Sequence, residues 1–158
     1  GFFQNDKAHQ LPIIQMIRKY QPDIILANSV HDRHPDHGKA AKLVADACFL
    51  SGLIKIETGQ EEWRPKAVYH YIQDEYIHPD ITIDITPYFD KKMESIKAYT
   101  SQFYNPDSDL PDTPISSKDF LEFIIGRAKL VCRPIGARYA EAFTATRNVG
   151  VTDLFQLV

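Results

Sequence analysis

The stretch that decides the fold runs from Asp23 to Ala40 and reads DIILANSVHDRHPDHGKA. Its first six residues form a short, nearly continuous apolar run after Pro22, which is typical of a strand buried on both faces in a parallel sheet. A polar turn over residues 29–38 follows, and apolar residues then recur at helical spacing from Lys39 to Leu50. The order of strand, polar turn and helix predicts that polar side chains gather at the carboxyl end of a sheet strand.

The rest of the chain continues this alternation of helices and strands. A helix is predicted over Lys7–Tyr20, where Leu11, Ile14 and Ile17 recur at three-residue spacing. Further strands are predicted at 67–72, 82–85 and 139–146, further helices at 88–103 and 116–131, and a proline-rich loop at 105–114. No repeat or composition shift divides the chain. We therefore expect a single α/β domain over residues 1–158, with a Rossmann-like, mostly parallel sheet flanked by helices.

Composition narrows the class of protein. The chain has 158 residues, 44% of them apolar and 25% charged, which is ordinary for a globular domain. A net charge of −3 gives no reason to expect a nucleic acid or an anionic membrane surface as partner. The apolar runs are far shorter than the ~20 residues of a membrane helix. Two cysteines, Cys48 and Cys132, are too few for a disulfide scaffold, so a reducing, cytoplasmic location is expected. A nucleophile elbow, a P-loop and a dinucleotide-binding glycine motif are absent from the sequence.

The polar turn carries the chemistry. Imidazoles, carboxylates and a guanidinium crowd into seven residues: His31, Asp32, Arg33, His34, Asp36 and His37. A His-x-x-His spacing lets two imidazoles face one point, so that one can bind zinc while the other gives or takes a proton. Asp36 could accept a hydrogen bond from an imidazole, and Arg33 could pair with an acidic side chain or an anionic substrate. The alternative is a plain polar turn with His37 in the first helical turn; the position at a strand end favours the metal site.

The motif Asp32-Arg33-His34-Pro35-Asp36-His37 resembles the second signature of the PIG-L/LmbE-like N-acetylglucosamine deacetylases. Within that family it is most similar to the bacillithiol-biosynthesis type, which deacetylates N-acetylglucosaminyl malate. The likeness continues at 84–85, 98–103 and 136–143 and so covers nearly the whole chain. The resemblance implies a cytoplasmic, zinc-dependent hydrolase that acts on a small N-acetylglucosaminide and self-associates, as a trimer or hexamer.

The resemblance also implies roles for particular residues. His37 would bind the zinc ion, His34 would stabilise the oxyanion or protonate the leaving amine, and Asp36 would orient His34. Some relatives place an active-site tyrosine near Phe120. The family's first signature, Ala/Pro-His-Pro-Asp-Asp, supplies two more zinc ligands and the general base, and this chain does not contain it. We therefore expect the chain to be the C-terminal portion of such a deacetylase domain, catalytically incomplete by itself, with apolar surface exposed and poor stability.

Two other functions fit the same residues. The first keeps the hydrolase and changes the substrate to another N-acetyl conjugate, such as a mycothiol precursor, a mercapturate-like compound or chitobiose. The second is a non-catalytic sugar-binding or assembly domain that retains the fold without the chemistry. Selectivity is expected in the loop over residues 105–114, since loops commonly carry it.

Overall fold

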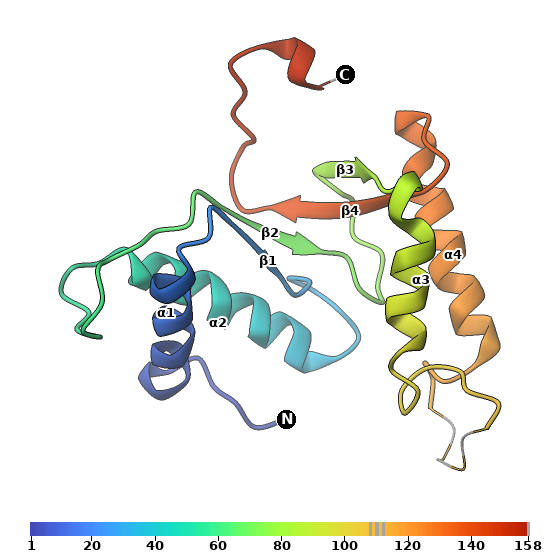
Figure 1. The fold of residues 1–158 in the computed structure, drawn as a ribbon, viewed down its shortest axis with the longest axis horizontal. Helices are drawn as coiled ribbons and strands as arrows, with labels where there is room; N and C mark the ends of the chain where they lie inside the picture. Colours follow the sequence, from blue (N-terminus) through green and yellow to red (C-terminus); the bar gives the residue numbers. More distant parts are fainter. Residues whose placement is uncertain (108, 110, 112, 158) are drawn as a thin grey trace. The chain divides into compact units, whose positions relative to one another are not determined.

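The computed structural model describes residues 1–157 except Ser108, Leu110 and Asp112. Its main elements are, in chain order, α1 (Lys7–Tyr20), β1 (Ile24–Ala27), α2 (Pro35–Ser51), β2 (Ala67–Tyr71), β3 (Ile81–Asp84), α3 (Phe89–Lys97), α4 (Lys118–Cys132) and β4 (Ala140–Ala145) (Figure 1). Every predicted helix and strand has a counterpart in this order, and the α/β class is confirmed. Among the described residues, no helix has the length and apolar character needed to cross a membrane.

The four strands form one sheet in the order β1-β2-β4-β3. β1 and β2 run parallel, with Ile24 opposite Ala67 and Ala27 opposite His70. β4 runs antiparallel to β2, with Tyr71 opposite Phe143. The expectation of parallel pairing therefore holds for β1 and β2, whereas β4 is reversed. The prediction that β1 is buried on both faces is wrong, because β1 stands at the end of the sheet order and Ile24 and Leu26 on it are more than half exposed. The pattern of β4 gave no sign of its direction, since strand pairing is set by contacts far apart in the chain.

The chain divides into two compact units, residues 1–81 with 143–158, and residues 82–142. In the first unit α1 and α2 pack against each other, and α2 contacts β1 and β2 (Figure 1). Buried apolar side chains from both helices, including Ile14, Ile17 and Ala47, form the core between them. That the whole chain acts as a single domain stays a prediction.

The start of α2 differs from the predicted one. We expected a polar turn up to Gly38, but the helix already begins at Pro35. His34 is its N-cap: the ring Nδ1 accepts a hydrogen bond from the backbone N–H of Asp36 at 3.2 Å. Pro35 then occupies the first turn, where a missing N–H and a fixed φ favour proline. A Cβ added at Gly38 would lie 3.2 Å from the carbonyl oxygen of Val30, so this position favours glycine. His37 consequently belongs to the first turn of a helix.

The second unit contains β3, α3, α4 and the first half of β4. Ser117 caps α4 by accepting from the backbone N–H of Phe120 at 3.1 Å. The ring of Phe120 stacks on that of Phe103, with centroids 6.1 Å apart. α3 ends at Lys97, earlier than the predicted helix over 88–103. The predicted loop over 105–114 lies in part outside the described residues, and its first residues form a turn in which Asp107 N–H donates to the Asn105 side chain.

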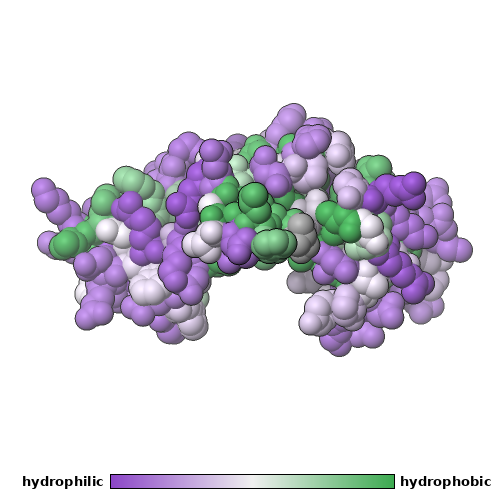
Figure 2. Space-filling model, turned by 90° about the horizontal axis from the view of Figure 1, so that it is seen from above, coloured by the Kyte–Doolittle hydropathy of each residue, from purple (hydrophilic) through white to green (hydrophobic). Residues whose placement is uncertain are grey.

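Apolar side chains are also exposed, and Figure 2 shows green areas between purple ones on the face drawn. On β1, the first strand in the sheet order, Ile24 is 55% and Leu26 57% exposed. This agrees with the expectation of exposed apolar surface. An edge strand with apolar side chains favours association with another chain.

Candidate functional site

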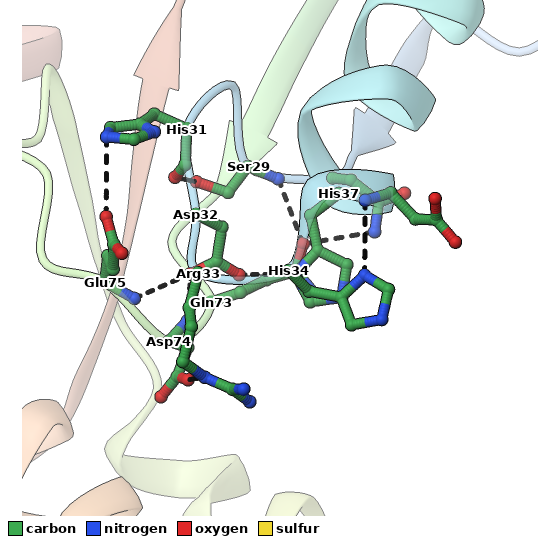
Figure 3. Close-up of polar contacts among 11 residues, drawn as sticks. Ser29, His31, Asp32, Arg33, His34, His37, Gln73, Asp74 and Glu75 are labelled. Atoms are coloured by element: carbon green, nitrogen blue, oxygen red, sulfur yellow. Dashed lines mark hydrogen bonds and ion pairs between the residues drawn. The ribbon is translucent and has the colours of Figure 1, made fainter. Parts of the chain in front are cut away.

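The candidate site lies where β1 and β2 end. The two strands are parallel, so their carboxyl ends meet at one edge of the sheet. The segment after β1 brings Asn28–His37 to this edge, and the segment after β2 brings Gln73, Asp74 and Glu75 (Figure 3). Contacts between these two segments build the site, and all of its residues belong to the first unit.

One ring nitrogen of His37 is held by a buried carboxylate. His37 Nδ1 is hydrogen-bonded to Oδ2 of Asp32, whose side chain is 0% exposed (Figure 3). The other oxygen of Asp32 accepts the backbone N–H groups of Asp74 and Glu75, at 3.1 and 2.7 Å. Burial raises the pKa of Asp32, but the hydrogen bonds from Glu75 N–H and His37 outweigh burial, and this pKa lies below its ordinary value of 3.8. Asp32 is therefore ionised and can only accept, so His37 Nδ1 must donate.

The other ring nitrogen of His37 faces an amide. His37 Nε2 lies 3.3 Å from Nε2 of Gln73. The oxygen of the same amide accepts the backbone N–H of Ser29 at 3.1 Å and the side-chain N–H of Asn28 at 3.1 Å. Because a backbone N–H only donates, the amide oxygen must face Ser29 and the NH₂ group must face His37. His37 Nε2 is therefore the unprotonated nitrogen and presents an electron pair.

His34 has the opposite tautomer. Its Nδ1 accepts the backbone N–H of Asp36, so in the neutral ring the proton is on Nε2. The rings of His34 and His37 are stacked, with centroids 5.2 Å apart and planes at 29°. Two neighbouring imidazoles thus present different groups: His37 an electron pair and His34 an N–H donor. A site of this kind can bind an electron-pair acceptor beside an oxygen that accumulates negative charge.

The other predicted site residues have local ionic partners. The carboxylate of Asp36 lies 3.7 Å from Nζ of Lys39, three residues along α2. Asp36 contacts His34 through its backbone N–H, which donates to the His34 ring. The carboxylate that contacts an imidazole in this turn belongs to Asp32, and its partner is His37. Arg33 Nε donates to Asp74 Oδ2 at 2.5 Å, and the Arg33 side chain is about half exposed. An anionic substrate group would therefore compete with Asp74 for Arg33.

Sequence reasoning assigned no role to Asp32 as the partner of His37, nor any to Gln73 or Asp74. The available signal was their position. Gln73 and Asp74 follow β2 directly, and the carboxyl ends of neighbouring parallel strands share one edge of a sheet. His70 on β2, 2% exposed, also supports this edge, because its Nδ1 is 2.7 Å from the carbonyl oxygen of Asn28.

The side chains of the site meet only part of what zinc needs. His37 fits the role of a zinc ligand, because Nε2 presents its electron pair and a carboxylate holds Nδ1 from behind. A catalytic zinc site has three protein ligands. Over the part of the chain that the structure describes, no group of three or more His, Cys, Asp or Glu side chains could hold a metal ion. The described residues thus supply one ligand and not a complete site, and no reaction step through a metal ion is derived for them.

No protein-family model matches the chain. Solved structures do. A conserved protein from Thermus thermophilus superposes with a TM-score of 0.83 at 24% identity, over 96% of this chain and 66% of that one. GalB, the 4-carboxy-2-hydroxymuconate hydratase from Pseudomonas putida, has a TM-score of 0.73 at 20% identity, over 94% and 62%. An N,N'-diacetylchitobiose deacetylase from Pyrococcus horikoshii has a TM-score of 0.67 at 23% identity, over 95% and 57%.

These likenesses define the fold. The chain is an α/β protein that shares its fold with these three structures, and it spans between 57% and 66% of their length. The same fold is shared with a hydratase, so the fold alone does not select a reaction. The choice depends on the side chains of the site.

Proposed function

We propose that this chain is part of a zinc-dependent amide hydrolase that removes the acetyl group from an N-acetylglucosaminide. The observation that carries the proposal is the pair of imidazoles with opposite tautomers, His37 with an electron pair and His34 with an N–H, at the carboxyl end of β1. The resemblance of the surrounding motif to a deacetylase signature and the fold shared with a chitobiose deacetylase support the same conclusion.

Each residue then has a defined task. His34 donates its Nε2–H to the amide oxygen as that oxygen becomes an oxyanion, and it is placed to protonate the leaving amine. His37 offers Nε2 as a zinc ligand, and Asp32 holds its ring in the required tautomer. Asp36, in the first turn of α2, donates its backbone N–H to Nδ1 of His34 and so orients that ring. In a complete site, zinc held by His37 together with two further protein ligands would supply polarisation of the acetamide carbonyl and a bound water with a pKa of roughly 7.

For the substrate we propose N-acetylglucosaminyl malate, which places the protein in bacillithiol biosynthesis in the cytoplasm, as a homo-oligomer. Arg33 is the residue that we propose to bind the acidic group of the substrate: its guanidinium is half exposed, and the substrate carboxylate would displace that of Asp74. The malate group supplies carboxylates of the same kind. Another N-acetyl sugar conjugate stays an alternative substrate. A non-catalytic sugar-binding domain stays an alternative function, and it is consistent with the single metal ligand found among the described residues.

Acetate release tests the proposal. Protein containing this chain is loaded with zinc and incubated in parallel with N-acetylglucosaminyl malate, N-acetylglucosamine and N,N'-diacetylchitobiose. His34→Asn is the informative variant, because asparagine also caps helices well while the imidazole N–H is lost. His31→Asn is its control, since the His31 side chain is 77% exposed.

We expect acetate release from the malate conjugate, lowered about 10²-fold or more by His34→Asn and left unchanged by His31→Asn. Release of acetate from chitobiose in preference to the malate conjugate would move the proposal to that substrate. No acetate from any N-acetylglucosaminide, with glycan binding that is equal with and without zinc, would replace the hydrolase by a sugar-binding domain.

A further inference from the structure

We propose that the apolar tail of the chain, residues 149–157, docks on a second copy of the chain, into a groove lined by Leu11, Ile14, Leu50 and Ile56. Neither the tail nor the groove contributes a residue to the candidate site at the ends of β1 and β2. The contact is therefore independent of the proposed hydrolase, and its tests use neither substrate nor zinc.

The tail is short, apolar and exposed. Leu154 is 77% and Phe155 83% exposed, and the segment also exposes Val149, Val151 and Leu157. Figure 1 shows that the tail leaves the end of β4 on the side away from α1 and α2. Apolar side chains gathered on a surface mark a place of contact with another molecule.

Local hydrogen bonds give the tail a defined shape. Leu154–Leu157 form a single 3-10 turn, and Asp153 fixes its start. The Asp153 side chain accepts the backbone N–H of Phe155 at 3.0 Å, and its carbonyl oxygen accepts that of Gln156 at 3.2 Å. Within the described part of the chain, the hydrogen bonds of residues 150–157 join tail residues to one another. A segment that is already shaped loses less conformational freedom when it docks.

The groove lies in the same compact unit as the tail, between α1 and the loop that follows α2. Its volume is about 450 Å³, within the range of ~300–1,000 Å³ that is common for binding pockets. Leu11 and Ile14 come from α1, Leu50 from the last turn of α2 and Ile56 from the loop. This apolar lining suits the leucine and phenylalanine side chains that the tail exposes.

The charges beside the two apolar surfaces are complementary. Lys7, Lys55 and Glu57 also line the groove. In the part of the chain that the structure describes, neither lysine has an ion-pair partner. One carboxylate oxygen of Asp153 accepts the Phe155 N–H, and the other oxygen can face an ammonium group. The tail thus carries an acidic group beside its apolar side chains, and the groove carries two basic groups beside its apolar lining.

The contact joins two different surfaces, since one copy supplies the tail and the next supplies the groove. Such a heterologous contact builds a closed ring or an open filament, whereas a two-fold dimer needs one self-complementary surface. The exposed edge strand β1 lies outside this contact, so the two surfaces are tested by different variants.

Sedimentation velocity over a range of concentrations tests the tail. Phe155→Asp should weaken self-association about 10- to 100-fold, the value of one buried aromatic side chain. Phe2→Asp is the matched control and should change nothing, because Phe2 is 99% exposed and belongs to neither surface. A wild-type chain that stays monomeric overturns the proposal, and so does equal association of Phe155→Asp and the wild-type chain.

A second set of variants tests the charges. Asp153→Asn keeps an oxygen that accepts the Phe155 N–H and removes the negative charge. We expect it to weaken association roughly two- to fivefold, as for an exposed ion pair. In a chain that also carries Lys7→Gln and Lys55→Gln, Asp153→Asn should have no further effect. Effects that simply add would overturn the pairing of Asp153 with the two lysines.

Disulfide cross-linking identifies the partner of the tail. Cys48 and Cys132 are buried, so thiols introduced at exposed positions react first. A Gln156→Cys chain, changed in the tail, is mixed with a Glu57→Cys chain, changed at the groove, and the mixture is oxidised mildly. We expect more cross-linked pairs in the mixture than in either chain alone.

Two other results of the cross-linking would overturn the proposal. An equal yield in the Gln156→Cys chain alone means that tails meet tails. A chain that carries both changes and forms only an internal disulfide has its tail folded onto its own groove.

Discussion

Arg18 on α1 connects this helix to the end of α2, so replacing it should destabilise the first unit. Its side chain is 4% exposed, and its guanidinium donates to the carbonyl oxygens of Ser51 at 3.0 Å, Leu53 at 2.8 Å and Ile56 at 2.6 Å, and to Thr58 Oγ1 at 2.7 Å. These contacts tie α1 to the C-terminal end of α2 and to the loop that follows. α2 carries His37 at its other end, so the stability of this helix also supports the site.

The perturbation is Arg18→Met, which keeps most of the aliphatic length and removes every donor. Each of the four hydrogen bonds contributes about 1 kcal/mol. The carbonyl of Ser51 keeps the N–H of Trp63 and that of Leu53 keeps the N–H of Ile56, so the further penalty of about 1–3 kcal/mol for a carbonyl without a donor concerns Ile56. With relaxation and water entry, the variant should lose about 3–5 kcal/mol of unfolding free energy, a large fraction of the ~5–15 kcal/mol of a typical domain.

Urea denaturation followed by circular dichroism measures this loss. Lys19→Met is the matched control, because Lys19 is exposed and its ammonium group lies over the Tyr20 ring, 5.1 Å from the centroid. We expect the control to stay within about 0.5 kcal/mol of the wild-type chain. A loss below about 1 kcal/mol in Arg18→Met would refute the claim that these hydrogen bonds hold the end of α2.

Three further predictions concern acid sensitivity, thiol reactivity and association. Folding lowers the pKa of Asp32, so its ionised carboxylate stabilises the folded chain at pH values above the ordinary pKa of 3.8. This stabilisation is lost as the pH falls through the lower pKa of the folded chain. In thermal melts over the acid range, the melting temperature should therefore fall less in Asp32→Asn than in the wild-type chain. Burial raises the pKa of the Cys48 thiol to about 11. A disulfide reagent at neutral pH should therefore label Cys48 only as fast as the chain unfolds, and fast labelling of the native chain would contradict this. Leu26→Lys, at a 57% exposed position on an edge strand, should reduce self-association in sedimentation experiments, whereas equal association would exclude β1 as the contact surface.

The sequence predicted the elements whose signals are local. The helix over Lys7–Tyr20 was predicted with its observed bounds, because an apolar period of three to four residues ends at Pro22. The start of α2 was predicted too late. Histidine is an uncommon N-cap, and Pro35, which the prediction placed in the turn, is a residue type that favours the first turn of a helix. The reversed direction of β4 has no local signal, because strand pairing depends on contacts far apart in the chain.

The site divides in the same way. The histidine turn and its place at a strand end were predicted from Asp23–Ala40, and the structure puts His34 and His37 side by side. The role of Gln73 was not predicted, since its contacts with Ser29 and His37 join segments far apart in the sequence. Asp32 lies only five residues before His37, and its role was missed because the sequence does not show which of the two carboxylates in the turn contacts the imidazole. The roles assigned to His34, Asp36, Arg33 and His37 stay predictions.

Zinc binding by the chain, with and without His37, tests the central claim most directly. Calorimetry with zinc chloride should show weak binding of about one ion to the wild-type chain, because the described residues supply a single oriented imidazole. His37→Ala should abolish this binding, and His31→Ala, at an exposed neighbour, should leave it unchanged. Zinc binding in His37→Ala that equals the wild-type value would contradict the account, because the electron pair at the carboxyl end of β1 would then not be the metal ligand.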